Sequence, residues 1–443
     1  MTIRIWTGPR AAALVLGAAM LAGCGLLDTQ TPNIVDPGTL ESPEGAASLR
    51  LGALADFGFV KDGDGTEFQD GLILVAGLLS DEFEHSTTPP SEQEIDQRTT
   101  AIINPSLYDV YANLHKARAG AERAIDALQR LSVEPDSSTD IAEMFAISGF
   151  AYVYFGEDFC SGVPFSKVVG DSLIYGAALT TTEVYDTALA RFDSALAQPG
   201  LSVDDGTITS LATMGRARAL LDLGRFAEAA DAASSVSTDF TYDTEHRESP
   251  LRLQNAIYLY TTDGLWSVSD FEGEVGLGYR TAEDPRVPFT DFEDTGLDLI
   301  TPQFSLDKYG PSDPVPVANG IEARLIEAEA LLQTNNFSGM RTILNDLRDI
   351  DGLDPLPTAG NREEAIDQLF SERAFWLFAT GHRLGDMRRL VRPPPTGYGR
   401  SVETVFPTGA YHKGGSYGTD VNLPIPLEEE NNPNSAGCFD RNP

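Results

Sequence analysis

Residues 372–389 read ERAFWLFATGHRLGDMRR, from Glu372 to Arg389, and this stretch decides the fold. Aromatic and aliphatic residues recur through it at helical spacing, and charged residues alternate with them on both sides of Gly381. The pattern predicts two helices joined by a turn at Gly381, with the apolar stripe buried. We interpret the charged residues as pairs that lock the helices together rather than as catalytic groups. This structural signature comprises Glu372, Arg373, Gly381, His382, Arg383, Asp386 and Arg388.

His382 is the residue of this stretch that a metal site or a reaction would use, and the rest of the chain argues against both. The 5 histidines are scattered, and none has the HxxxH or HExxH spacing of a zinc site. We therefore expect His382 to act through structural hydrogen bonds. The sequence predicts no metal site and no cofactor.

Two segments of the chain repeat each other. Ala219-Leu220-Leu221 followed by Phe226 aligns with Ala330-Leu331-Leu332 followed by Phe337. In each copy a small residue and two leucines end one helix, and the phenylalanine opens the next after a short polar turn. This resembles the helix-turn-helix unit of tetratricopeptide repeats, in which small residues let paired helices pack closely.

Apolar residues at intervals of three and four predict further helices over 107–131, 139–156 and 181–198. We expect Thr139, and Thr181 or Thr182, to be N-caps. The sequence therefore predicts a mainly α fold, an irregular tetratricopeptide-like helical-repeat scaffold in a single domain over 46–443. Loop-rich insertions with short strands are expected at about 51–98 and 237–316, and long insertions of this kind tend to be functional.

The amino-terminal residues predict export. Met1–Arg10 is basic, and Ala11–Leu21 is an apolar run too short to span a bilayer. Leu21-Ala22-Gly23-Cys24 resembles the lipobox of bacterial lipoproteins, in which residues 1–23 would be removed and Cys24 would carry fatty acids such as palmitate. Residues 24–45 then form a tether. The alternative is an ordinary secreted protein with a chance cysteine.

The net charge limits the classes of partner that the protein can bind, and the cysteine content bears on disulfide formation. A formal net charge of −36 disfavours nucleic acid and anionic lipid headgroups, because both would be repelled. With Cys24 lipidated, Cys160 and Cys438 are the two thiols left in a compartment where disulfides persist. We expect them to form a disulfide, the alternative being two separately buried thiols.

The stretch 372–389 also resembles the carboxy-terminal signature of SusD/RagB-type outer-membrane lipoproteins, whose typical pattern is E-R-x-x-E-L-x-F-E-G-H-R-x-x-D-x-R-R. It departs from this pattern at Trp376 and Thr380, where the family has acidic residues. Further elements similar to the family's occur in the family's order, namely Phe155-Gly156 through Gly162-Val163-Pro164-Phe165, Ala178–Tyr185, Asn422–Pro426 and Asn432-Pro433-Asn434. The similarity covers nearly the whole chain after residue 23.

The resemblance implies a lipoprotein anchored in the outer membrane and facing the exterior. It implies binding of an oligosaccharide or peptide and delivery to a TonB-dependent, SusC-like receptor, without chemistry on the ligand. Sugars present apolar faces and hydroxyl rims, so we expect aromatic rings beside polar side chains in the insertions. The candidate ligand contacts are Asp81, Phe83, His85, Trp266, Asp270, Tyr279 and Tyr309, each with loop packing as its alternative role.

Other functions stay open. The repeats could serve only to grip a protein partner. Val168–Leu173 resembles the nucleophile block of GDSL-type esterases, with Ser172 as nucleophile and Asp243 with His246 as partners, but it lies mid-chain between predicted helices and has little support. Asp62–Glu67 is rich in oxygen ligands but lacks the spacing of an EF-hand calcium loop, so we interpret it as a turn.

Overall fold

The computed structural model describes residues 40–65, 70–131, 137–170, 172–199, 201 and 206–442. The expected signal peptide, Cys24 and most of the expected tether lie outside these residues. In the described part of the chain, no helix combines the length and the apolar character needed to cross a membrane.

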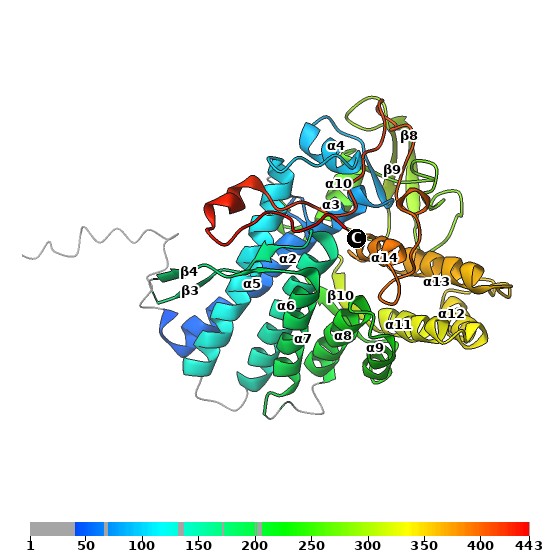
Figure 1. The fold of residues 1–443 in the computed structure, drawn as a ribbon. Coiled ribbons are helices and arrows are strands. Elements are labelled where there is room, and N and C mark those ends of the chain that lie inside the picture. Colours follow the sequence, from blue (N-terminus) through cyan, green and yellow to red (C-terminus); the bar gives the residue numbers. More distant parts are fainter. Residues whose placement is uncertain are drawn as a thin grey trace, which may run out of the picture.

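Helices that follow one another in the chain pack side by side and form the frame of the molecule (Figure 1). Their apolar faces meet in one continuous core. The frame comprises α2 (Pro43–Asp62), α5 (Pro105–Leu131), α6 (Ser137–Asp158), α7 (Thr181–Leu196), α8 (Gly206–Asp222), α9 (Phe226–Ala233), α11 (Gly320–Gln333), α12 (Phe337–Ile350), α13 (Arg362–Trp376) and α14 (Arg383–Val391). The prediction of a mainly α, repeat-like scaffold is confirmed.

The two repeat copies have the same turn as well as the same helices. Phe226 and Phe337 are the first residues of α9 and α12. In the first turn Gly224 has φ +71°, and in the second Asn335 has φ +59°. The next backbone N–H then donates to the carbonyl five residues earlier, Arg225 to Leu220 and Asn336 to Leu331, both at 2.9 Å. Glycine and asparagine tolerate this left-handed conformation best, which explains the turn residues.

Glycines allow α6, α7 and α8 to approach closely. Phe192 of α7 lies between Gly149 of α6 and Gly215 of α8. A Cβ atom at Gly149 would lie 2.6 Å from the Phe192 ring, and one at Gly215 would lie 2.1 Å from it. No side chain fits in either place, so these helices can pack in this way only with glycine at both positions.

The helix starts differ from the predicted caps. Thr180, rather than Thr181 or Thr182, is the N-cap of α7: its hydroxyl accepts the Glu183 N–H, and the Glu183 carboxylate accepts the Thr180 N–H. This reciprocal capping box fixes the helix one residue earlier. Thr139 lies inside the first turn of α6, because that helix already begins at Ser137.

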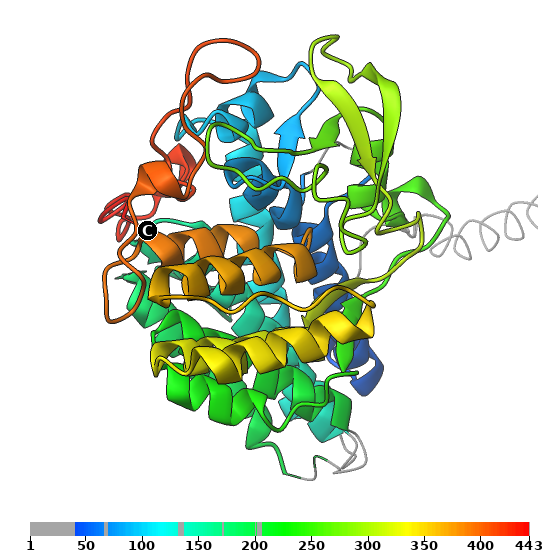
Figure 2. The same ribbon diagram turned by 90° about the vertical axis from the view of Figure 1, so that its right-hand side faces the viewer.

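The predicted insertions form a second layer, which covers one end of the helical frame (Figure 2). The 51–98 region is helical at both ends, where α2 continues to Asp62 and α4 comprises Pro90–Asp96, and α3 (Leu72–Leu79) and β1 (Phe83–His85) lie between them. The 237–316 region holds short strands and one helix, namely β6 (Thr241–Thr244), α10 (Ala256–Thr262), β7 (Trp266–Val268), β8 (Phe289–Thr295), β9 (Pro302–Leu306) and β10 (Val315–Asn319).

Antiparallel strand pairs hold this layer together. β6 pairs with β10, so the chain leaves and re-enters the helical frame at one place. β1 pairs with β7, with Phe83 opposite Val268 and His85 opposite Trp266, and this pair joins the two insertions. β8 pairs with β9. Two smaller ladders, β2 (Val163–Pro164) with β5 (Ala178–Leu179) and β3 (Lys167–Val169) with β4 (Ser172–Ile174), follow α6.

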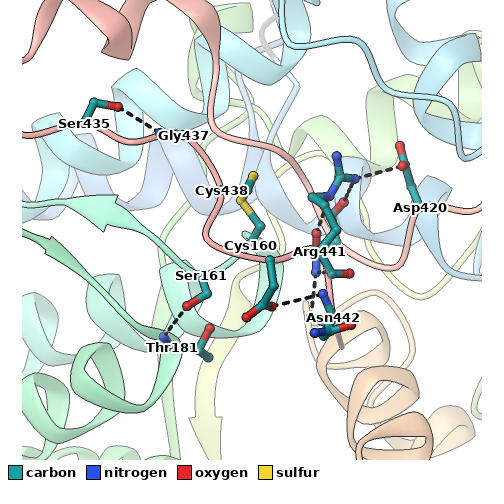
Figure 3. The surroundings of a disulfide bond; sticks show 11 residues. Cys160, Ser161, Thr181, Asp420, Ser435, Gly437, Cys438, Arg441 and Asn442 are labelled. Carbon is teal, nitrogen blue, oxygen red and sulfur yellow. Dashed lines mark hydrogen bonds and ion pairs between the residues drawn. A yellow bond between two sulfur atoms is a disulfide. The ribbon is translucent and has the colours of Figure 1, made fainter.

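The carboxy-terminal segment returns to the end of α6. Cys160 and Cys438 form a disulfide there, with their Cα atoms 5.7 Å apart (Figure 3). The Phe439 N–H donates to the Ser161 carbonyl at 2.7 Å, and the Cys160 N–H donates to the Leu423 carbonyl at 2.9 Å. The last residues are therefore fixed to the segment that leads into the β3–β4 hairpin.

Candidate functional site

The residues of the 372–389 signature form buried ion pairs. Arg373 of α13 donates two hydrogen bonds to Asp386 of α14, at 2.7 and 2.9 Å, and Arg389 donates a third at 2.6 Å. Burial opposes ionisation of Asp386, but the charges of Arg373 and Arg389 hold its pKa well below the usual range. These contacts lock the two helices together.

Other signature residues tie this helix pair to both insertions and to α12 of the frame. Glu372 accepts hydrogen bonds from Arg286 at 2.7 Å and from Arg348 at 2.5 Å. Arg383 donates to both oxygens of Asp81, at 2.5 and 2.8 Å.

The remaining members act in the same structural way. Arg388 donates to the Gly156 carbonyl at 2.8 Å and to the Glu157 carbonyl. His382 lies 3.3 Å from Glu322, and its other ring nitrogen lies 2.8 Å from the Thr380 hydroxyl. Gly381 has φ +81°, which suits the turn.

The candidate ligand contacts lie in the interior. Phe83, His85 and Trp266 pack between the insertions and the frame, and Phe83 meets Trp266 and Phe378 edge-on. Buried rings have no face free for a ligand in this structure, so the side chains in question are parts of the frame rather than an exposed platform. This placement holds for Asp81, Phe83, His85, Trp266, Tyr279 and Tyr309.

The polar members of that set have protein partners. Tyr309 donates to the Ala379 carbonyl at 3.2 Å, and Tyr279 lies 3.4 Å from Asp81, the partner of Arg383. Asp270 is half-buried and accepts the backbone N–H groups of Arg280 and Thr281, both at 3.0 Å. Their hydrogen bonds hold loops in place.

The structure does not bring the predicted esterase residues together. Ser172 lies in the exposed hairpin β3–β4. His246 follows β6 and contacts Asp62 of α2, with Nε2 3.1 Å from Oδ2. Within the described ranges no hydrogen bond joins Ser172 to His246 or to Asp243; Asp171 is outside those ranges.

A cleft of about 660 Å³ lies between helix α2 of the frame and the start of the 237–316 insertion, and we call it the α2–β6 cleft. Its walls come from residues 51–63, mostly in α2, and from residues 241–253, in β6 and the loop that follows. Ile147 of α6 and Thr207 of α8 complete the lining. Its volume falls within the roughly 300–1,000 Å³ of typical small-molecule sites.

One wall of the cleft is aromatic. Phe57 is buried and stacks on Tyr154, with ring centroids 5.9 Å apart. Phe59 is half-buried, and the Arg252 guanidinium lies 5.3 Å from its ring centroid. Leu51 and Leu253 are exposed at the rim. This wall offers an apolar face with a cation beside it.

Tyr242 is held in place on the opposite wall. Its hydroxyl donates to Glu143 at 2.8 Å, and Arg50 donates to the same carboxylate at 2.7 Å. Burial and the nearby Glu143 charge raise the pKa of Tyr242 well above its usual value, so the hydroxyl stays protonated. The ring is thus a fixed part of the wall.

Thr244 and His246, which line the cleft and which we call its floor, contact a buried ion pair that is not part of the lining. Lys61 is buried and donates to Asp62 at 2.7 Å, and Thr244 and His246 contact the other Asp62 oxygen. Burial lowers the pKa of Lys61. Burial opposes ionisation of Asp62 too, but Lys61 and His246 hold its pKa below the ordinary value. Asp62 is therefore held in an ion pair inside the protein.

A comparison with protein families matches the carboxy-terminal quarter of the sequence, and a comparison with solved structures matches the fold. Residues 322–431 match the model of the SusD family. A SusD-like protein from Bacteroides fragilis NCTC 9343 has the same fold with a TM-score of 0.65 at 13% identity, covering 91% of this chain and 98% of that one. The chain therefore has the fold of SusD-like proteins, and its carboxy-terminal quarter matches the SusD family model.

Other solved structures agree with this assignment. A protein described as a laminarin-binding SusD-like protein gives a TM-score of 0.65 at 15% identity, over 89% of this chain and 99% of that one. A SusD-like carbohydrate-binding protein from Bacteroides vulgatus ATCC 8482 gives 0.61 at 13% identity, over 78% and 83%. No curated protein sequence matches the chain significantly.

The two departures from the SusD/RagB signature have structural roles here. Trp376 lies beside the Arg286 guanidinium, with its ring centroid 5.0 Å from it. The Thr380 hydroxyl contacts the Leu377 carbonyl and His382. At these two positions an aromatic ring and a hydroxyl make local contacts.

Sequence reasoning missed the residues that line the α2–β6 cleft. Phe59 lies near the end of a helix and Arg252 in a polar loop, and nothing in the spacing of either marks a site. His246 was singled out, but as an esterase residue. The sequence did indicate the regions that line the cleft, because both segments expected to be functional insertions contribute residues to its walls.

Proposed function

We propose that this SusD-type protein is a surface lipoprotein of the outer membrane that binds an oligosaccharide and delivers it to a TonB-dependent, SusC-like transporter without altering it. The observation that carries the proposal is the α2–β6 cleft, which helix α2 and the 237–316 insertion form on a frame with the SusD-like fold. Solved proteins of the same fold are described as laminarin-binding and as carbohydrate-binding, which favours a sugar over a peptide.

The lining of the cleft suits a sugar. Phe59 supplies a flat apolar ring for the C–H face of a pyranose, and Tyr242 adds a second aromatic ring to the lining. Asp243, Thr241 and Arg247 lie along the same lining and offer acceptors and donors for hydroxyl groups. A mixed lining of this kind orients a neutral, hydroxyl-rich ligand.

Binding without chemistry agrees with the environment of His246. Its Nε2 atom contacts the Asp62 carboxylate, which is itself paired with Lys61. In the described residues no serine hydroxyl or thiol is hydrogen-bonded to this ring. An activated nucleophile needs such a contact. The ring therefore serves as part of the floor.

Calorimetric titration of the chain from residue 24 onward, carrying Cys24→Ser, tests the proposal. The panel should hold laminari-, malto- and xylo-oligosaccharides, with mixed peptides as the competing ligand class. At least one oligosaccharide should bind. Phe59→Leu and Arg252→Ala should each weaken that binding by about two- to tenfold, the range expected for loss of one aromatic or cation–π contact.

Arg216→Ala is the matched control, because Arg216 is a partly exposed arginine of α8 paired with Asp193 and is not part of the cleft lining. It should leave the affinity unchanged. Binding of peptides alone, or equal affinity in all variants, would overturn the assignment of the cleft to a sugar.

A protein-interaction scaffold without a ligand is the competing function. The helical frame of stacked pairs is compatible with it, since solenoid-like repeats bind partners along one face. The same titration decides between the two, because a pure scaffold would show no heat with any oligosaccharide or peptide.

A further inference from the structure

The β3–β4 hairpin is an apolar element that no other part of the described chain covers. Its side chains are unusually exposed, at 64% for Val168, 56% for Val169, 52% for Leu173, 46% for Ile174 and 43% for Tyr175. In the register of the ladder, Val168 lies opposite Leu173 and Lys167 opposite Ile174. Apolar groups are therefore exposed on both faces, and Figure 1 shows the hairpin projecting from the body.

The base of the hairpin is held firmly. Arg118 of α5 donates to the Ser166 carbonyl at 2.7 Å, on the side where the chain enters. Asn434 donates to the Tyr175 and Gly176 carbonyls, at 3.0 and 3.2 Å, on the side where it leaves. The Cys160–Cys438 disulfide fixes the segments that carry these contacts (Figure 3). The projection is thus mounted on the frame rather than loosely attached.

This arrangement is costly for an isolated protein. Apolar side chains left in water forgo the free energy of burial. β3 and β4 pair only with each other, so the outer edge of each strand has unpaired backbone groups. A two-stranded hairpin is marginal alone, and a mostly apolar open edge, with Lys167 as the one charged residue of the two strands, is a template for pairing.

The charge of the hairpin differs from that of the molecule. Between Asp158 and Glu183 the sequence contains only Lys167 and Asp171 as charged residues, in a chain of net charge −36. The hairpin is therefore a nearly neutral apolar surface on a strongly acidic protein. Such a surface lets another acidic protein approach without repulsion.

The described chain begins close to the hairpin base. Glu41 pairs with Arg130 at 3.0 Å, and Arg118, which holds the hairpin, lies on the same helix α5 about 18 Å away by helical rise. Cys24 precedes Leu40 by 16 residues, which reach about 55 Å when extended. If Cys24 is anchored as proposed, the hairpin lies within reach of proteins embedded in the same membrane.

The open edges decide between lipid and protein as the occupant. In hydrocarbon every backbone polar group must be paired, so an open two-stranded hairpin is a poor membrane insertion element. A strand edge of another protein satisfies these groups and covers the apolar side chains. We propose that hairpin β3–β4 docks by strand addition onto the exposed edge of an extracellular hairpin of a membrane-embedded partner protein. This inference rests on the proposed function, which supplies the anchor and the partner.

Site-specific photocrosslinking in intact cells tests the proposal with the full-length lipoprotein. A photoreactive residue at Leu173 should give one major adduct, identified by mass spectrometry as an integral outer-membrane protein. The same probe at Ile350, a 59% exposed apolar residue at the end of α12, should not give that adduct. Adducts of Leu173 with lipid only, with a second copy of the chain, or with no protein would overturn the proposal.

The double variant Val168→Thr and Leu173→Thr gives an independent readout. Threonine retains β-propensity, so the hairpin should still form, while the apolar cross-strand pair is lost. Co-purification of the crosslinked partner should fall at least about tenfold, which corresponds to about 1.4 kcal/mol. Unchanged co-purification would contradict the proposal.

Oligosaccharide affinity separates this inference from the proposed function. The double variant should bind oligosaccharide as the unmodified chain does, because the α2–β6 cleft contains no hairpin residue. If the unmodified chain binds no sugar but the Leu173 adduct forms, the ligand assignment fails and the docking element stands. If the unmodified chain binds sugar but the Leu173 adduct does not form, only the docking proposal is overturned.

Discussion

Asp386 receives hydrogen bonds from Arg373 and Arg389 at a place where all three side chains are buried. For single residues, the consequence is that a buried carboxylate is kept ionised by cations that are themselves buried. The burial penalty is recovered only while every member is present. The sequence predicted that these residues would be structural pairs, but it could not assign partners such as Asp81 for Arg383, which are remote in the chain.

Removing the Asp386 charge should destabilise the fold strongly. Asp386→Asn leaves two buried guanidinium groups with a neutral acceptor, and breaking a buried pair typically costs about 3–5 kcal/mol. The midpoint of urea unfolding at about pH 7 measures this loss. Asp193→Asn, which removes the exposed partner of Arg216, should cost less than about 1 kcal/mol. Equal effects would show that the buried pairs do not hold the frame.

The buried carboxyl group of Glu82 should make the stability of the fold depend on pH. Burial raises its pKa to about 8, although the Ala379 N–H and Arg383 act against this shift. A carboxyl with a raised folded pKa contributes stability below its unfolded pKa and loses that contribution as pH rises toward the folded value.

Glu82→Gln keeps the acceptor for the Ala379 N–H and removes the titration. The variant should match the unmodified protein at about pH 4.5 and exceed its unfolding free energy by more than about 1 kcal/mol at about pH 9. Paired urea titrations at the two pH values measure the gap. A gap that does not change with pH would contradict the assignment of Glu82.

At the scale of elements, helices were the predictable part of the structure. The helices predicted over 107–131, 139–156 and 181–198 correspond to α5, α6 and α7 within a few residues, because a buried face imposes a 3.6-residue period. The repeat was visible because two equivalent turns need the same residue types at the same spacing. The strands were less visible, since ladders of two to five residues carry too little alternation to recognise.

A pair of glycine substitutions tests the close packing of the frame. Gly215→Ala places a methyl group against the Phe192 ring and should destabilise the fold by about 1–3 kcal/mol. Gly52→Ala lies on an exposed part of α2 with nothing within 4 Å, and should stabilise it by about 0.5–1 kcal/mol through helix propensity. Thermal unfolding of the two variants measures the destabilisation expected for Gly215→Ala and the stabilisation expected for Gly52→Ala. Stabilisation by Gly215→Ala would contradict the packing described for α7 and α8.

At the scale of the whole molecule, the fold could be predicted from the sequence and the site could not. The signature stretch, the repeats and the insertions all lie in the expected order along the chain. The aromatic candidates were chosen because they lie in loop-rich segments, yet these loops fold back and bury Trp266 and Tyr279. A single sequence does not reveal which loop aromatics pack inward, because that depends on contacts between segments far apart in the chain.

The proposed anchoring of the protein in the outer membrane can be tested separately. With Cys24 acylated, each buried methylene adds about 0.8 kcal/mol of membrane affinity, so the unmodified chain should fractionate with the outer membrane and incorporate labelled palmitate. Cys24→Ser should abolish the label and release the protein, while the double variant Cys160→Ser and Cys438→Ser should keep the label. Label in the Cys24→Ser variant would contradict the anchor.

Hydrogen exchange with a bound oligosaccharide tests the central claim most directly. The sugar that binds in the calorimetric panel should slow amide exchange in residues 51–63 and 241–253, the two segments that form the α2–β6 cleft, and the sugar should be recovered intact. Protection confined to other segments, or recovery of a cleaved sugar, would contradict the account of this protein as a receptor that binds in that cleft without chemistry.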